Sequence, residues 1–343
     1  LHAIPWSIRV RQPLGYLAYL WLHICMNSEA FDDGMLREAE KRFQEAANLP
    51  PAEKKRLMGE IEFIRGGLAF NDYEKITKHY LKAYKLLAGP SFVTYTRASW
   101  IYGSPSVAFV NHDKPGKLDR YQYMLGKHQD ILLALTGGAT MGAFELVTAE
   151  CHLERGQLEL AERALEDASE LIDTRQHITS FLVWQFARAR LLMARGRRAE
   201  ALALLQKSAP RIEATEMFEQ IQCHDLALGY VLGCLERTDG LPRWLADGKV
   251  HGSPYGTVQI LAFTLTTYGK ILLARNDFAS LAKLVESSPD RFGPFDTPFS
   301  TIHIRIFQAI LARQRRDIPA ALESLTAAVE VSRPAGLVPA SPQ

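Results

Sequence analysis

The sequence lacks the short motifs that carry catalytic or nucleotide-binding chemistry. It contains no H-E-x-x-H, G-x-S-x-G, C-x-x-C or G-x-G-x-x-G pattern. The glycine-rich stretch 135–142 is no phosphate-binding loop, because Ala143 stands where such a loop has its lysine. Acidic residues such as Glu159 and Glu162 fall on outer helix faces rather than in facing pairs. We therefore expect that the protein is not an enzyme and binds no cofactor or metal. The weakest alternative is an (α/α)-toroid enzyme.

Cysteines are few, and long apolar runs are missing. The four cysteines lie in helical segments at no metal-ligand spacing: Cys25, Cys151, Cys223 and Cys234. They are typical of reduced, small core residues, which favours a cytoplasmic location. The longest apolar run near the start, 14–26, is too short to cross a bilayer, and no signal peptide is recognisable. We expect no membrane contact.

Neither sign of charge dominates. The 343 residues include 40 basic and 38 acidic side chains, a net charge of +2. Basic clusters such as Arg195, Arg197 and Arg198 fall at predicted helix ends, where they complement the helix dipole. Without a basic surface, we expect no direct nucleic-acid contact from this segment.

The chain does contain a repeated helix–turn–helix pattern. Residues 141–172 read as two amphipathic helices joined at Gly156, with small residues where the helices must approach closely. The same junction recurs at a step of 40 residues, at Gly116, Gly196, Asn276 and Arg316, with a degenerate unit near position 236. Two further, less even units lie around Gly34 and Asn71. A recurring pair of helices that cannot bury its apolar face alone is typical of a tetratricopeptide (TPR) repeat.

We therefore predict an all-α fold, a TPR-like α-solenoid of about eight antiparallel helix pairs. A single such domain would fill residues 1–333, because no linker or change in composition divides the chain. Residues 334–343, with three prolines, would form a flexible tail.

The inner face of the stack is the first candidate site. In a TPR stack the first helix of each pair lines the concave surface. Counting back from each turn by one fixed offset selects one residue per repeat, and a second count selects the residue one helical turn earlier. Together the two counts give the candidate groove residues Glu150, Phe186, Arg190, Tyr230 and Lys270. Their aromatic faces and charged ends suit a small ligand or a peptide. The alternative is that Glu150 pairs with Arg190 between repeats while the aromatic rings belong to the core.

The non-repeating segment 89–106 is the second candidate site. It contains Trp100, Tyr102 and Ser104 among other aromatic and hydroxyl residues, and insertions in repeat proteins often form the binding face. The alternative is a loop that packs its own aromatic rings against the repeats. Sequence alone leaves open whether this loop or the groove binds.

Four stretches resemble the helical region of MalT-like, LuxR-type bacterial transcriptional regulators. They are AIPWSIRVRQPLGYLAYLWLHI (3–24), AFNDYEKITKHYLKAYKLLAGPS (69–91), SWIYGSPSVAFVNHDKPGKLD (99–119) and AECHLERGQLELAERAL (149–165), the most specific portion being 70–119. The resemblance implies a sensor region that binds a small-molecule inducer or a regulatory protein. It also implies an attached ATPase and a helix-turn-helix domain, both absent here. Residue 1 is leucine rather than methionine, so we expect a fragment. A stand-alone scaffold that binds a partner peptide or protein remains the alternative.

Overall fold

The computed structural model describes residues 5–9, 11–26, 33–69, 72–95, 100–101, 103–111, 114, 117–250, 260–292 and 297–333. Within these ranges the chain forms helices and no strands, so the predicted all-α class is confirmed. The predicted tail 334–343 lies outside the described residues, as do the predicted junctions at Asn71 and Gly116.

The N-terminal half contains helices of uneven length and spacing. They are α1 (Trp6–Arg9), α2 (Pro13–Met26), α3 (Gly34–Glu45), α4 (Pro51–Leu68), α5 (Tyr73–Leu86), α6 (Phe92–Tyr95), α7 (Val107–Asn111) and α8 (Leu118–Leu135). Proline at the first position of α2 and α4 suits a helix start, where its missing N–H has no partner to lose. The glycine-rich stretch after α8 is a turn between helices, as predicted.

In the described residues of the C-terminal half, the helices form five successive pairs. They are α9 (Ala143–Glu154) with α10 (Leu158–Leu171), α11 (Ile178–Ala194) with α12 (Arg198–Glu213), α13 (Phe218–Cys234) with α14 (Arg243–Ala246), α15 (Leu261–Ala274) with α16 (Phe278–Phe292), and α17 (Pro298–Gln314) with α18 (Ile318–Ser332). The third pair is the degenerate unit expected near position 236, because α14 has only four residues.

The turns inside these five pairs share one geometry at the predicted 40-residue step. The turn residue has a left-handed backbone in each pair: Gly156 (φ 69°), Gly196 (φ 74°), Glu236 (φ 55°), Asn276 (φ 55°) and Arg316 (φ 63°). In the second pair, Gly196 N–H donates to Met193 O (2.9 Å) and Arg197 N–H donates to Leu192 O (2.8 Å). The same two bonds recur in the other pairs and form the Schellman motif, which satisfies the last carbonyls of a helix.

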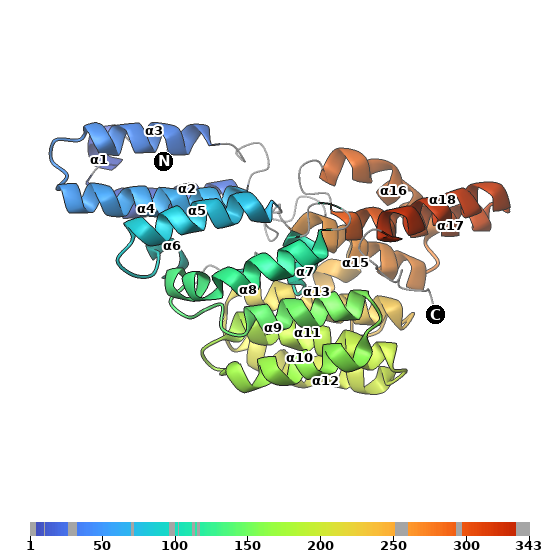
Figure 1. Cartoon of the computed structure of the whole chain (residues 1–343). Helices are drawn as coiled ribbons and strands as arrows, with labels where there is room; N and C mark the ends of the chain where they lie inside the picture. The colour runs from blue at the N-terminus through green and yellow to red at the C-terminus, as the bar shows by residue number, and fades with distance from the viewer. Residues whose placement is uncertain are drawn as a thin grey trace.

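The first helices of successive pairs contact one another in series. α9 contacts α11, α11 contacts α13, α13 contacts α15, and α15 contacts α17, while α7 contacts α9. We call α9, α11, α13, α15 and α17 the inner helices. Figure 1 shows the result as an arc in which α1–α5 form one arm, α9–α12 the base and α15–α18 the other arm.

Small residues recur at one position of the inner helices. One position per pair, at the same 40-residue step, holds alanine or glycine: Ala149, Ala189, Gly229, Gly269 and Ala309. A Cβ added at Gly229 would lie 2.6 Å from Leu245 Cδ1, and one at Gly269 would collide with the ring of Phe307. Close helix approach therefore depends on the missing side chains. The residue after each of the first four is a candidate groove residue: Glu150, Arg190, Tyr230 and Lys270.

Candidate ligand-binding site on the inner helices

The structure brings the five predicted groove residues together. Arg190 on α11 places Nη1 4.0 Å from Glu150 Oε1 on α9, and its guanidinium carbon lies 5.7 Å from the ring centre of Phe186. Phe186 meets Tyr230 on α13 edge to face, with ring centres 5.2 Å apart. Lys270 on α15 places Nζ 4.8 Å from the ring centre of Tyr230. A constant offset within a repeat thus placed residues 40 apart side by side, as the periodicity predicts. We call these five residues the inner-helix row.

Glu150 lies beneath the surface of this row. Its side chain is fully buried, and Oε2 accepts hydrogen bonds from the backbone N–H groups of Val107 and Ala108, both at 2.8 Å. These N–H groups open α7, where no earlier turn of helix could accept them. Burial raises the pKa of Glu150, and the nearby Arg190 partly offsets the rise. Glu150 therefore binds the first backbone N–H groups of α7 and does not face solvent.

Arg190 is the charged member of the row that has a strong partner. Its Nη2 donates to a carboxylate oxygen of Glu154, one turn after Glu150 on α9. Its side chain as a whole remains 19% exposed. The count along the sequence did not select Glu154, because it lies one helical turn after Glu150, the position that the fixed offset selects.

Lys270 has no carboxylate partner among the described residues. Burial lowers the pKa of Lys270, but the Cys234 thiol, to which it hydrogen-bonds, and the Tyr230 phenol raise it on balance. The ammonium group thus remains charged while it is held by weakly polar neighbours. A desolvated cation without a counter-ion is costly to the free protein and favours an incoming anion.

His303 on α17 lies near both cations. Its Nδ1–H donates to Phe299 O at 2.8 Å, which leaves Nε2 as the bare nitrogen, buried and without a partner in the described part of the chain. Burial first, and then the charges of Lys270 and Arg190, lower the pKa of His303 to about 3. The ring is therefore neutral at pH 7 and presents an acceptor beside two cations.

The aromatic members of the row serve mainly as core. Phe186 is 1% exposed and Tyr230 is 8% exposed. Both pack on Phe263, edge to face for Phe186 (5.6 Å) and stacked for Tyr230 (5.8 Å). These contacts agree with the alternative of an inter-repeat ion pair above core rings. Ligand binding by the row stays a prediction.

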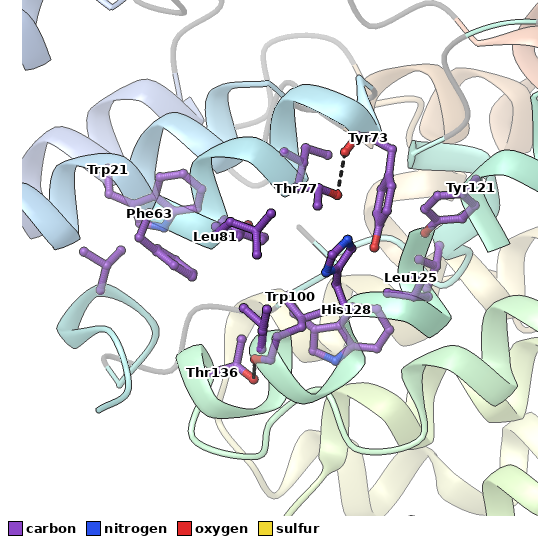
Figure 2. Close-up of a pocket in the computed structure, with 16 residues that line it drawn as sticks. Trp21, Phe63, Tyr73, Thr77, Leu81, Trp100, Tyr121, Leu125, His128 and Thr136 are labelled. Carbon is purple, nitrogen blue, oxygen red and sulfur yellow. Dashed lines mark hydrogen bonds between the residues drawn. The ribbon is translucent and has the colours of Figure 1, made fainter. Parts of the chain in front are cut away.

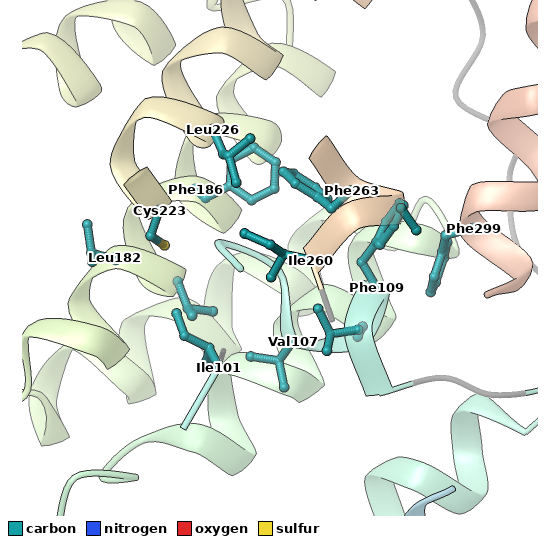
Figure 3. Packing of buried hydrophobic residues seen from close by; sticks show 14 of the residues in the cluster. Ile101, Val107, Phe109, Leu182, Phe186, Cys223, Leu226, Ile260, Phe263 and Phe299 are labelled. Carbon is teal, nitrogen blue, oxygen red and sulfur yellow. The ribbon is translucent and has the colours of Figure 1, made fainter. Parts of the chain in front are cut away.

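The segment that carries the second candidate site packs onto the inner helices. Ser104 is fully buried, and its hydroxyl donates to Ser106 O at 2.8 Å and accepts from Ser106 N at 3.1 Å. Phe109 packs on Phe263 (5.0 Å) and Phe299 (5.8 Å). Figure 3 shows Ile101, Val107 and Phe109 among rings and aliphatic side chains of the inner helices. This placement agrees with the alternative of a loop that packs against the repeats. Tyr102 lies outside the described residues.

Trp100 faces a cavity that the sequence did not predict. The cavity is bounded by α2, α4, α5, α6 and α8, with Trp100 and Val107 as further walls, and holds about 880 Å³ of space between atoms, part of it continuous with solvent. Figure 2 shows the ring of Trp100 beside the imidazole of His128, which projects from α8 toward Tyr73 and Thr77. Because the walls come from helices with no common period, no fixed offset could have selected them.

Other kinds of site are not seen in the part of the chain that the structure describes. No group of three or more His, Cys, Asp or Glu side chains there could hold a metal ion. No helix in these ranges is long and apolar enough to cross a membrane. Cys151 and Cys223 are free and buried, and burial raises the pKa of both thiols.

Comparison with known proteins identifies no family. No family model matches the chain, and no curated protein or solved structure matches it significantly. The fold and the site are therefore interpreted from their own geometry.

Proposed function

We propose that the chain is a non-catalytic, signal-sensing domain that binds a small molecule with an anionic group on its inner helices. The observation that carries the proposal is that Lys270 has no carboxylate partner in the described residues, while Arg190 beside it pairs with Glu154. Together their charges act on His303 and help keep its ring neutral. A carboxylate or phosphate would accept hydrogen bonds from both cations.

The architecture that we assign to this domain is a TPR-like α-solenoid. The support is the five Schellman turns at one step, the serial contacts of the inner helices and the small residues between them. In such a stack each repeat contacts only its neighbours, so a ligand that touches several inner helices can favour one curvature.

The biological setting that we propose is the sensor region of a MalT-like, LuxR-type regulator. The support is the sequence resemblance, strongest in residues 70–119. A change of curvature would then pass to an attached ATPase and helix-turn-helix domain as a shift between two populations.

A thermal-shift screen tests the proposed site. Carboxylate- and phosphate-bearing metabolites are added to the wild type, to Lys270→Met and to Lys283→Met at constant ionic strength. Methionine keeps an apolar stem over the Tyr230 ring but removes the charge, whereas Lys283 is an exposed lysine on α16. A ligand at 100 times its Kd should stabilise the wild type and Lys283→Met by about 2.7 kcal/mol.

The same ligand should stabilise Lys270→Met far less, because the charge that attracts the anion is gone. A screen without any stabilising anion would overturn the proposal. Equal stabilisation of all three proteins would also overturn it, because binding would then occur elsewhere.

A further inference from the structure

One side of α18 carries a row of exposed apolar side chains. They follow one another at steps of four, three and four residues, which places them on a single face, because residues three and four apart are neighbours on a helix surface. Each is between 42% and 60% exposed: Ile318, Leu322, Leu325 and Val329. We call these four residues the α18 stripe. A contiguous apolar patch that is left exposed marks an interaction surface more often than a chance cluster does.

The repeat shows what this face needs. At the 40-residue step, the position of Leu325 holds a buried aliphatic side chain in the four preceding pairs: Leu165, Leu205, Leu245 and Val285. In three of these pairs the helix that follows packs against the outer helix, because α10 contacts α11, α12 contacts α13, and α16 contacts α17. In the first case Trp184 Nε1–H on α11 also donates to Leu165 O on α10, at 2.9 Å.

The outer helix of the last described pair differs from the other three. Its main contacts in the described part of the chain are with α17, the inner helix of its own pair, and Figure 1 shows the two side by side. Leu325 therefore has the residue type of a buried position but is 43% exposed. The α18 stripe is a surface built to be covered by one more helix.

The spacing of the stripe identifies a suitable covering helix. The steps of four, three and four read the same in both directions along the chain. In an antiparallel pair of α18 helices, Ile318 of one copy would face Val329 of the second copy, and Leu322 would face Leu325. A contact of this kind is isologous, since the same patch serves both copies, and it closes as a two-fold dimer.

Charge favours the antiparallel pairing over a parallel one. The exposed arginines Arg315 and Arg316 directly precede α18, and the exposed Glu330 lies near its end. An antiparallel pair brings the arginines of one copy close to Glu330 of the second copy, at both ends of the contact. A parallel pair would place the arginines of both copies together and would set the two helix dipoles side by side in the same direction. No member of the stripe is charged, so no charge loses its hydration in the seam.

The area of the stripe predicts that the dimer is weak. Four partly exposed side chains from each copy bury less than the roughly 1,600 Å² of a standard stable interface. We therefore expect a reversible dimer with a Kd between about 1 and 100 µM.

We propose that α18 binds a second copy of this chain through the α18 stripe, as an antiparallel, two-fold symmetric helix pair. The proposal does not depend on anion binding, because the stripe lies on α18 whereas the inner-helix row lies on α9, α11, α13 and α15.

Sedimentation velocity tests the association. The wild type, Leu322→Glu and Leu160→Glu are compared over about 1–300 µM, a range that spans the expected Kd. Leu160 is the matched control, because it is an exposed leucine (38%) on the outer helix α10, away from the stripe. The wild type and Leu160→Glu should pass from monomer to dimer with equal Kd. Leu322→Glu should associate at least about 10-fold more weakly, because its carboxylate would enter an apolar seam, while its far-ultraviolet spectrum stays helical.

Engineered cysteines test the direction of the pairing. A mixture of Ile318→Cys and Val329→Cys should give a disulfide-linked dimer under mild oxidation. Ile318→Cys alone should not, because an antiparallel pair separates the two copies of position 318 by about 16 Å, eleven residues of helix, whereas the Cβ atoms of a disulfide lie about 4 Å apart. The wild type, with its native cysteines, gives the background.

Three results would overturn the proposal. If the wild type stayed monomeric over the whole range, the stripe would belong to a different polypeptide. If Leu322→Glu associated as strongly as the wild type, the dimer would form on another surface. Efficient linkage of Ile318→Cys alone would contradict the antiparallel direction.

Discussion

At the scale of single residues, Glu150 was predicted to line a ligand-binding groove, but its side chain stabilises the fold by accepting backbone hydrogen bonds from α7. Replacing Glu150 with alanine removes the carboxylate oxygen that accepts from the buried N–H groups of Val107 and Ala108. We predict that Glu150→Ala lowers the free energy of unfolding by about 3 kcal/mol. Glu150→Gln should cost about 1 kcal/mol or less, because its amide oxygen can still accept both bonds. Urea denaturation of the two variants measures the difference, and equal losses would contradict this role.

His303 makes the stability of the folded protein depend on pH. Its pKa is about 3 in the folded chain, whereas an unfolded histidine titrates near its ordinary value of about 6.5. As the pH falls below about 6.5, the unfolded chain takes up a proton that the folded chain refuses. Stability must therefore fall with falling pH, by at most about 1.4 kcal/mol per pH unit for this one group.

His303→Gln should remove that contribution. We predict that urea midpoints at pH 7, 6 and 5 fall less steeply for His303→Gln than for the wild type. Parallel curves for the two proteins would show that the histidine is not held neutral.

At the scale of residues, the sequence allowed us to predict which groove residues lie near one another. It did not allow us to predict which of them are buried. The 40-residue step brought Arg190, Tyr230 and Lys270 together, because equivalent positions on stacked helices lie side by side. The burial of Glu150 depends on α7, which lies on the non-repeating segment. No periodicity describes that segment, so its contacts could not be predicted.

At the scale of elements, the five turns offer a natural comparison. Two of them carry glycine at the left-handed position, and three carry Glu236, Asn276 or Arg316. Glycine adopts this conformation without the clash that a Cβ causes. We predict that Arg316→Gly stabilises the protein by about 0.5–1 kcal/mol, and that Gly196→Ala destabilises it by about 1 kcal/mol.

Thermal unfolding measures both variants. The space around Gly196 is open, with nothing within 4 Å of an added Cβ, so the loss would report backbone strain alone. Unfolding temperatures that move in the same direction for both variants would contradict the shared geometry.

The positions of these turns could be predicted from sequence because each follows a helix of similar pattern. The length of α14 could not, although the extension by Asp239 and Gly240 indicated an irregular unit. After α13 the chain turns again at Gly240 (φ 77°) and forms only one turn of helix at Arg243–Ala246. Leu245 of that turn still fills the space above Gly229, so the short helix preserves the packing.

At the scale of the whole molecule, residues 100–101 and 103–111 connect parts that are distant in sequence. Trp100 faces the N-terminal arm, Val107 is held by Glu150 on α9, and Phe109 packs on Phe263 and Phe299 of α15 and α17. Phe109 is 6% exposed. This one segment therefore lies between the cavity and the inner helices.

We predict that Phe109→Ala destabilises the protein by about 3–4 kcal/mol through the cavity that it leaves. Because its contacts lie on α15 and α17, hydrogen exchange should accelerate there, more than 150 residues away in sequence. Tyr123→Ala, which removes a side chain that is 56% exposed, is the control and should change little. Faster exchange confined to the neighbourhood of residue 109 would contradict the connection.

The central claim is that the inner helices form the sensing surface, and hydrogen exchange with a bound ligand tests it most directly. The strongest anion from the thermal-shift screen is added at saturation, and exchange is compared with the free protein. The account predicts protection in the peptides that contain Arg190, Tyr230 and Lys270, on α11, α13 and α15, with the effect lost in Lys270→Met. Protection confined to the outer helices α10, α12 and α16, or to α4, α5 and α8, would contradict it.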